Sequence, residues 1–249
     1  MMESIFNFRD LGNVPTSGGK VKEKLLIRGG ALNSVSESDL KDLKEIYHLN
    51  TIVDFRDTGE LEAKPDMEIE GTKYIHLNVI GQNEVSANPA KIAKDAQRQQ
   101  EGKYMEVLYE NFVHYKTSSD CYKEFVNIVK NHQEGSIYFH CSAGKDRTGF
   151  AAYILLRLLG ASDEEAMNDY MRSNDVSDEQ LQVLMKDLME AFEGLDPDTL
   201  KSYLGVKTEY LQSSIDAIKE LYGDFDTYRK EVLEVSDEDV ALLRSKFCE

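Results

Sequence analysis

The sequence has few basic residues for its length. Of 249 residues, 29 are Lys or Arg and 46 are Asp or Glu, so the formal net charge is −17. A field of this sign repels nucleic acids and anionic membrane surfaces at long range. We therefore expect no nucleic-acid partner.

Cysteine and long apolar runs are also scarce. The three cysteines, Cys121, Cys141 and Cys248, lie far apart and form no CxxC pair, which argues against a disulfide framework and a zinc site. The longest apolar run, FAAYILLRLLG, is short and interrupted by Arg157, and the N-terminus MMESIFNFRD lacks a basic region followed by an apolar stretch. We expect a soluble cytoplasmic protein in a reducing compartment, without stable membrane insertion or a removable signal; secretion without a cleaved signal stays open.

The pattern of apolar residues predicts an α/β fold. Only four prolines occur, and no Ser/Gly-rich linker or repeat marks a boundary, so we predict one domain over residues 1–249. A helix beginning after Ser36 lies between the first two of the predicted strands. Strand, helix, strand is typical of α/β layers. The four β-like runs are LLIR (25–28), TIVDF (51–55), KYIHLNV (73–79) and SIYFH (136–140).

The C-terminal part and one internal stretch favour helices. Ser162 with Glu165 and Ser177 with Gln180 fit the capping-box pattern, and we predict that 160–249 is mostly helical. Residues 81–135 are polar at first and then amphipathic. They have two interpretations, a pair of ordinary surface helices or a mobile helical lid beside a site.

The stretch YFHCSAGKDRTGF, residues 138–150, predicts an anion site. A β-run ends at His140, a turn covers Ser142 to Arg147, and an apolar helix starts near Thr148. Backbone N–H groups in such a turn point inward, and the helix adds its positive N-terminal dipole. A phosphate dianion fits that field.

Cys141 and Arg147 supply the chemistry of this turn. The field that binds phosphate also favours a thiolate, which makes Cys141 a nucleophile. Arg147 offers a planar fork that binds two phosphate oxygens at once. A Walker nucleotide loop is excluded, because Phe139 stands where it needs its first Gly and Asp146 where it needs Ser or Thr.

A buried structural role is the alternative interpretation for a free cysteine. We accept it for Cys121 and Cys248. For Cys141 the spacing Cys, five residues, Arg, Thr between a strand and a helix makes it the weaker interpretation.

These motifs resemble a known family. His-Cys-x5-Arg-Thr-Gly is the signature of cysteine-dependent phosphatases, and HCSAGKDRTG is similar to a bacterial branch of tyrosine and dual-specificity phosphatases. Segments from most of the chain share this resemblance, whereas 81–117 matches poorly. It implies a tyrosine-phosphatase-like fold with a mostly parallel central sheet flanked by helices. The similar segments are NFRDLGN (7–13), LIRGGAL (26–32), TIVDFRDTGE (51–60), DYMRSND (169–175) and EYLQSSIDAIKELYG (209–223).

The resemblance implies a two-step mechanism without metal or cofactor. Cys141 attacks phosphorus, and water later hydrolyses the phosphocysteine. Arg147 and the loop amides hold the phosphate oxygens, and Thr148 hydrogen-bonds the thiolate. His140 orients the loop. The phosphate-binding residues are Ser142, Ala143, Gly144, Lys145 and Thr148.

Lys145 bears on specificity, because a cation inside the loop suits multiply phosphorylated head groups. The resemblance implies activity on phosphotyrosine, and also on phosphoserine/threonine and phosphoinositides, so the expected partner is a phosphorylated protein or a phosphoinositide. The alternatives are a phosphoinositide-selective phosphatase, a thiolate sulfurtransferase or arsenate reductase, and an inactive phosphate-binding module. The sequence leaves the oligomeric state open.

Asp146 is the predicted general acid. Many tyrosine phosphatases carry this acid on a Trp-Pro-Asp loop, but this chain has no Trp, and its only Pro-Asp pairs are Pro65–Asp66 and Pro197–Asp198. Asp146 is fixed next to Arg147 and could protonate the leaving group and then deprotonate water. Asp66 is the alternative.

Six further charged residues lie in similar motif positions, three of them after a predicted strand, where α/β folds place their sites. We expect them to brace the loop through ion pairs rather than to take part in chemistry. They are Arg9, Asp10, Arg28, Asp54, Arg56 and Asp57.

Overall fold

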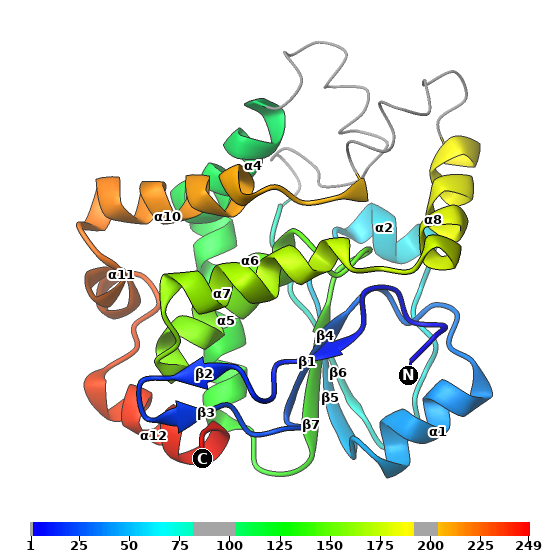
Figure 1. Ribbon diagram of the computed structural model, residues 1–249, viewed down its shortest axis with the longest axis horizontal. Coiled ribbons are helices and arrows are strands. Elements are labelled where there is room, and N and C mark those ends of the chain that lie inside the picture. The colour runs from blue at the N-terminus through cyan, green and yellow to red at the C-terminus, as the bar shows by residue number, and fades with distance from the viewer. Residues whose placement is uncertain (1, 82–102, 192–203) are drawn as a thin grey trace.

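The computed structural model describes residues 2–81, 103–191 and 204–249 (Figure 1). Its strands are β1 (Arg9–Asp10), β2 (Pro15–Thr16), β3 (Gly19–Lys20), β4 (Leu26–Gly29), β5 (Leu49–Asp54), β6 (Lys73–His76) and β7 (Ser136–His140). Its α-helices are α1 (Glu37–Glu45), α2 (Thr58–Ala63), α4 (Lys103–His114), α5 (Lys116–Asn131), α6 (Arg147–Leu159), α7 (Asp163–Met171), α8 (Asp178–Ala191), α10 (Thr208–Tyr222), α11 (Phe225–Glu231) and α12 (Asp237–Phe247), and a 3-10 turn, η1, covers Arg172–Asn174.

The central sheet has five strands in the order β1-β4-β7-β5-β6. β4, β7, β5 and β6 run parallel to their neighbours, and β1 alone is antiparallel, on β4. β2 and β3 form a separate hairpin. The prediction of an α/β fold with a mostly parallel sheet flanked by helices is confirmed.

The two faces of the sheet are covered by different helices. Side chains alternate along β7, so Phe139 faces a large core formed with α4, α5, α6 and α10, whereas Tyr138 packs with Leu43 of α1 on the other face. In Figure 1 most helices lie to the left of the strands and α1 lies to the right. β7 is thus buried on both faces, which agrees with its continuous apolar run.

The register of three parallel strands aligns their carboxyl ends at the site. Gly29 of β4 and Asp54 of β5 both lie opposite His140 of β7. The carboxyl ends of all three strands therefore meet at one edge of the sheet. The turn predicted to bind an anion leaves β7 at this edge, between its two neighbours, and leads into α6.

The helix signals hold at two of three predicted starts. Ser36 caps α1 through its side chain, and Ser162 and Glu165 form a reciprocal capping box on α7. At α8, Ser177 accepts from the Gln180 backbone, but the Gln180 side chain donates to the carbonyls of Glu3 and Ile5. Of the expected capping box, the structure thus shows the bond to Ser177, while the Gln180 amide nitrogen ties α8 to the N-terminal segment.

Where the internal stretch 81–135 is described, it forms two amphipathic helices, α4 and α5, each with one face buried and the other more exposed. Tyr109 and Phe112 of α4 and Tyr122 and Phe125 of α5 are all fully buried or nearly so. The two helices belong to the core, because their amphipathic faces carry large aromatic residues that pack against α6 and α10. Residues 82–102 lie outside the described part, and the lid hypothesis for them stays a prediction.

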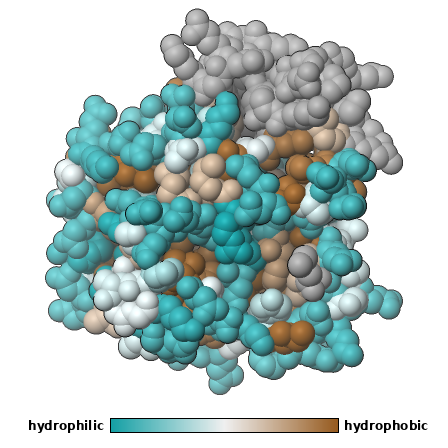
Figure 2. All heavy atoms as spheres, in the orientation of Figure 1, coloured by the Kyte–Doolittle hydropathy of each residue, from teal (hydrophilic) through white to brown (hydrophobic). Residues whose placement is uncertain are grey.

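One face of the described surface is mainly hydrophilic. On the face drawn in Figure 2, hydrophilic residues prevail and hydrophobic ones show as small separate areas. Within the three described ranges, every helix is too short or too polar to cross a membrane.

Candidate active site

The turn between β7 and α6 is packed tightly against the end of β4. Gly144 has a φ of +65°, and a Cβ at this position would lie 2.2 Å from the carbonyl oxygen of Gly29. Only glycine meets both conditions without displacement. Gly29 at the end of β4, Gly30 after it and Gly144 therefore let two backbone segments touch.

The carbonyl oxygens of the turn are bound on its outer side. The Ala31 N–H donates to Ser142 O over 3.1 Å, and Asn7 Nδ2 and Arg28 Nη2 donate to Gly144 O over 2.9 and 3.0 Å. In a trans peptide the N–H points opposite to the C=O. The N–H groups of Ala143 and Lys145 are thereby directed to the inner side, as an anion cradle requires.

Cys141 and Arg147 lie at the two ends of this turn, and both are buried, with 2% of each residue exposed. The Arg147 guanidinium holds Glu60 of α2 through two bonds, Nη1 to Oε2 at 2.6 Å and Nη2 to Oε1 at 2.9 Å. Burial alone would raise the pKa of Glu60, but Arg147 lowers it to about 2. Arg147 Nε is buried and has no partner among the described residues.

Glu60 was not singled out in the sequence, although it is central to the site. Its Oε1 also accepts from Ser142 Oγ over 2.6 Å. Asp57 caps α2 and forms a reciprocal capping box with Glu60, which fixes the carboxylate. The spacing Asp-x-x-Glu directly after a predicted strand was the signal that could have found it. Asp57 therefore supports the turn through Glu60, and, against the opposing effect of burial, its negative charge, like that of Glu60, raises the pKa of Arg147.

Thr148 stands in the first turn of α6 and is fully buried. Its Oγ1 has no hydrogen-bond partner within the described ranges. A buried hydroxyl without a partner is costly unless something else binds it. Its position just past Arg147 suits a donor to a ligand or to the Cys141 sulfur.

Lys145 and Asp146 are both buried, with 8% of each residue exposed. Lys145 Nζ donates to Gly205 O over 3.3 Å and lies 3.5 Å from an Asp146 oxygen. Asp146 also accepts from the Tyr109 hydroxyl over 2.8 Å, and Tyr109 in turn contacts the Tyr170 hydroxyl at 2.7 Å. Burial and the Asp146 carboxylate hold the pKa of Tyr109 well above its usual range, so this hydroxyl stays a donor. Lys145 therefore lies inside the site and is not a solvated surface lysine.

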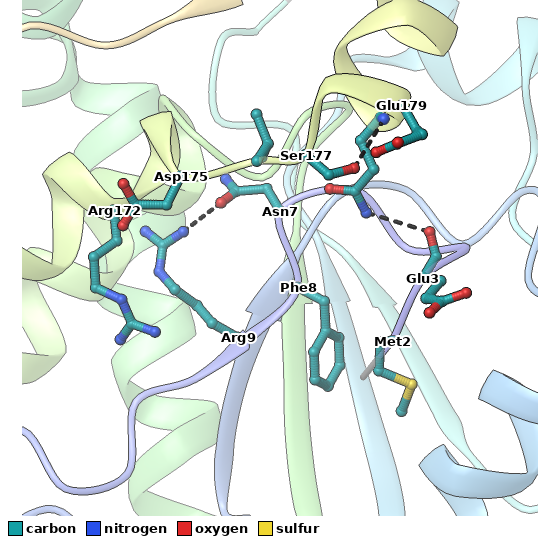
Figure 3. Close-up of a pocket in the computed structure, with 11 residues that line it drawn as sticks. Met2, Glu3, Asn7, Phe8, Arg9, Arg172, Asp175, Ser177 and Glu179 are labelled. Carbon is teal, nitrogen blue, oxygen red and sulfur yellow. Dashed lines mark hydrogen bonds between the residues drawn. The ribbon is translucent and has the colours of Figure 1, made fainter.

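An arginine cluster, formed by Arg9, Arg28 and Asp169, lies behind the turn. Asp169 accepts from Arg9 Nε at 3.0 Å and from Arg28 Nη1 at 2.6 Å, and all three side chains are buried. Burial alone would raise the pKa of Asp169, but the two arginines lower it. Arg9 also donates to Asn7, as the dashed line in Figure 3 shows. Two cations share one carboxylate here, directly behind Gly144.

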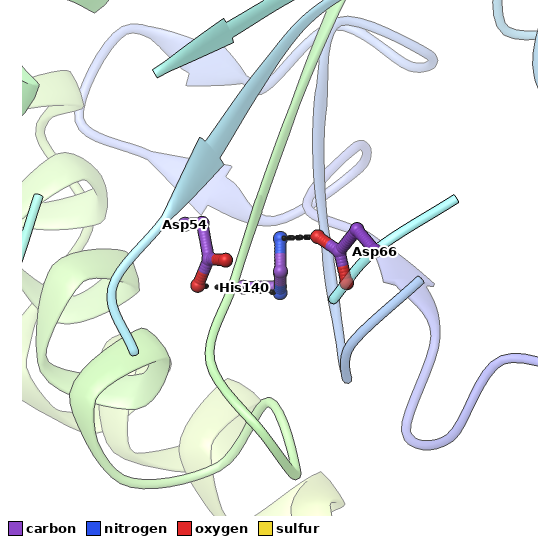
Figure 4. A group of neighbouring side chains, drawn as sticks. All are labelled: Asp54, Asp66 and His140. Carbon is purple, nitrogen blue, oxygen red and sulfur yellow. Dashed lines mark ion pairs between the residues drawn. The ribbon is translucent and has the colours of Figure 1, made fainter. Parts of the chain in front are cut away.

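A histidine cluster, formed by His140, Asp54, Asp66 and Arg56, lies at the start of the turn, and Figure 4 shows its first three members. His140 Nε2 is 3.0 Å from an Asp66 oxygen, and Nδ1 is 3.9 Å from Asp54. Arg56 binds Asp54 at 2.7 Å and Asp66 at 2.9 Å. Burial alone would lower the pKa of His140, but the two carboxylates raise it.

The histidine cluster also bears on two alternatives. Ligand atoms of Asp54, Asp66 and His140 lie within 4.8 Å of one another, as in a metal site. Arg56 already supplies the cation between the two carboxylates, so the group is satisfied by ion pairing. Asp66 Oδ1 further accepts from the Leu32 N–H and lies 2.9 Å from Arg56, whereas Oδ2 faces His140 at 3.0 Å. Asp66 is poorly placed to release a proton to a substrate.

Among the six charged residues expected to brace the turn, Asp10 is an exception. Its carboxylate accepts from the backbone N–H groups of Gly12 and Lys24. It stabilises the loop after β1 and not the anion turn, because short-range backbone donors reach it first. Pro197–Asp198 lies outside the described residues.

Comparison with known proteins decides the family. The model of the tyrosine phosphatase family matches residues 1–249. The chain belongs to the tyrosine phosphatase family. This phosphatase is 30% identical over 248 residues to a protein assigned as a tyrosine-protein phosphatase in Cupriavidus necator, with 98% of this chain and 86% of the relative covered. It is 23% identical over 259 residues to the triple specificity protein phosphatase PtpB of Mycobacterium tuberculosis, with 91% of both chains covered.

The family assignment confirms the resemblance drawn from the motifs. The phosphatase acts on phosphorylated substrates, as its family does. Its turn brings together a buried cysteine, inward N–H groups and an arginine whose Nε has no partner in the part of the chain that the structure describes. Such a set can bind a phosphoryl group and stabilise the charge that develops as it is transferred.

Proposed function

We propose that this phosphatase hydrolyses phosphotyrosine, and also phosphoserine/threonine and phosphoinositides, through a phosphocysteine intermediate. The observation that carries the proposal is the state of Arg147. Two of its nitrogens are bound to Glu60, whereas Nε is buried without a partner in the described part of the chain. A buried, unpaired guanidinium N–H six residues after a cysteine is what an oxyanion would satisfy.

The first step forms a bond between Cys141 Sγ and phosphorus and breaks the ester bond. The N–H groups of Ala143 and Lys145 and Arg147 Nε bind the equatorial oxygens as their charge grows. Asp146 gives its proton to the leaving oxygen. The second step reverses these roles. Asp146 takes a proton from water, water attacks phosphorus, and the thiolate leaves with Thr148 Oγ1 as its donor.

Asp146 is favoured over Asp66 as the general acid by its contacts. One Asp146 oxygen has a single neutral donor, Tyr109, and the other faces Lys145 at 3.5 Å. Asp66 lies 2.9 Å from Arg56 and 3.0 Å from His140, inside the histidine cluster. A general acid must reach the leaving oxygen, and Asp146 lies within the turn next to Arg147, whereas Asp66 is held in the histidine cluster by Arg56 and the Leu32 N–H.

Lys145 supports the broader substrate range. Its ammonium is buried beside the turn and is bound to the backbone of Gly205. A second phosphate on an inositol ring would meet this cation, whereas phosphotyrosine has no such group. The triple specificity named for the Mycobacterium relative agrees with this breadth.

The test is a panel of phosphotyrosine, phosphoserine and phosphothreonine peptides and phosphoinositides, with Cys141→Ser as control. We expect all classes to be hydrolysed by the wild type, none by Cys141→Ser, and labelled phosphate to stay on the protein after a rapid acid quench. Hydrolysis of phosphoinositides alone would favour the phosphoinositide-selective alternative. Turnover by Cys141→Ser would contradict the intermediate, and no hydrolysis of p-nitrophenyl phosphate would favour the inactive module.

The acid is tested by leaving-group dependence. Asp146→Asn should lose about 100-fold or more on phosphotyrosine, in line with the usual share of general acids, and much less on an aryl phosphate with an acidic phenol. Asp66→Asn is the matched variant and should lose a similar small factor on both. A selective loss in Asp66→Asn instead would reverse the assignment.

A further inference from the structure

Asn7 is a buried residue that neither the motif chemistry nor the phosphatase reaction assigns. It is 5% exposed, and its φ of +52° is in the left-handed region, which few residues other than glycine adopt. Such a conformation persists only where the surroundings hold it, and it is frequent at functional sites. The contacts of its side chain indicate the role of this residue.

The Asn7 amide joins the arginine cluster to the anion turn. Its Nδ2 donates to Gly144 O at 2.9 Å and also lies 3.4 Å from Ala143 O. Its Oδ1 accepts from Arg9, as Figure 3 shows at the wall of a cavity of about 500 Å³. The bond from Arg9 fixes which end of the amide is the donor, because Arg9 has no acceptor to offer.

We infer that Asn7 is a positioning residue for the phosphate site: with Arg28 it holds the Gly144 carbonyl on the outer side of the turn, so that the Lys145 N–H faces the oxyanion. The reason is the geometry of the peptide unit. Glycine at 144 can adopt more than one backbone conformation, so the Gly144–Lys145 peptide is the one most able to flip. A flip would point a carbonyl oxygen at the phosphate and remove one donor.

This inference rests on the proposed phosphate site, and Asn7→Asp tests it. Aspartate has the same shape, tolerates a positive φ and keeps the partner Arg9. It replaces the donor by an oxygen that repels the Gly144 carbonyl. We expect the inhibition constant for vanadate, measured on p-nitrophenyl phosphate hydrolysis, to rise about tenfold or more, as for the loss of one oxyanion donor.

Two further variants separate positioning from stability. Asn7→Gly keeps the positive φ and removes the donor without adding repulsion, so its loss of vanadate affinity should be smaller than that of Asn7→Asp. Asn13→Asp is the matched control, because Asn13 has a φ of +66°, is exposed and donates to Glu23. Its vanadate affinity should stay within about twofold of the wild type, as for an exposed site away from the turn.

The outcomes are distinct. If Asn7→Asp and Asn7→Gly lower only the free energy of unfolding and keep the wild-type vanadate constant, Asn7 is merely structural and the inference is wrong. If Asn7→Asp fails to fold, the inhibition constant of Asn7→Gly for vanadate decides: an increase supports the inference, and a wild-type value contradicts it. If the wild type itself neither hydrolyses the ester nor binds vanadate, the proposed function fails, a result that differs from wild-type binding with unaffected Asn7 variants.

Discussion

The arginine cluster and the histidine cluster brace the same turn with opposite charge balances. In the arginine cluster, Arg9 and Arg28 share the single carboxylate of Asp169. In the histidine cluster, Asp54 and Asp66 share Arg56 and His140. The first therefore has an excess of positive charge among its members, and the second is neutral only while His140 is protonated.

This difference assigns different tasks to the two clusters. The arginine cluster lies behind Gly144, where its excess positive charge favours a bound anion, and it holds no group that titrates near neutral pH. The histidine cluster lies below the strand end that leads to Cys141 and contains a residue whose charge changes near neutrality. The first gives a constant field, and the second makes the support of the turn depend on pH.

Removal of one carboxylate from each cluster should have the largest effect on the free energy of unfolding, and the size of the loss should differ between the two clusters. Asp169→Asn leaves Arg9 and Arg28 buried beside each other without an anion, and we expect a loss of about 3–5 kcal/mol in the free energy of unfolding. Asp66→Asn leaves Asp54 on Arg56, so its loss should be about 1–3 kcal/mol. Urea denaturation of both variants provides the measurement. Equal losses would show that the charge balance of a cluster does not determine how much its carboxylate stabilises the fold.

The histidine cluster should make stability fall at higher pH. The pKa of His140 is raised above its ordinary 6.5, because Asp54 and Asp66 outweigh the opposing effect of burial. A pKa that is higher in the folded state gives stability that is complete below about pH 6.5 and is lost as the pH rises through the folded value. His140→Gln should be less stable below that range and should lack this alkaline decline.

The control for this prediction is His132→Gln. Burial lowers the pKa of His132, so its contribution changes on the acidic side and its removal should leave the alkaline decline intact. The measurement is the urea midpoint at several pH values. An alkaline decline in His140→Gln as steep as in the wild type would assign it to another group.

The sequence predicted the parts of the site that depend on neighbours in the chain. The turn after His140 and the helix beginning at Arg147 follow from local patterns, and the structure has them there. Glu60 and Asn7 were missed because their contacts with Arg147 and Gly144 span 87 and 137 residues of the chain. Asp10 follows Arg9 in the same motif and was expected to brace the turn as Arg9 does. Its carboxylate instead accepts from the backbone N–H of Gly12.

The smallest expected effect comes from the outer edge of the histidine cluster. Tyr74 on β6 is 43% exposed, yet its hydroxyl donates to Asp54 over 2.6 Å. Tyr74→Phe removes only this bond and leaves Arg56 on Asp54, so we expect a loss of about 0.5–1.5 kcal/mol in the free energy of unfolding. Tyr115→Phe, at 37% exposure, is the matched control and should change stability by less.

The pH dependence of this loss distinguishes Tyr74 from His140. Burial and Asp54 raise the pKa of Tyr74 above its ordinary 10, so the hydroxyl keeps its proton throughout the range in which His140 titrates. The stability difference between the wild type and Tyr74→Phe should therefore be nearly constant from about pH 6 to 9, whereas that of His140→Gln should shrink. A Tyr74→Phe difference that disappears at the alkaline end would mean that the hydroxyl acts through the charge of His140 and not on Asp54 alone.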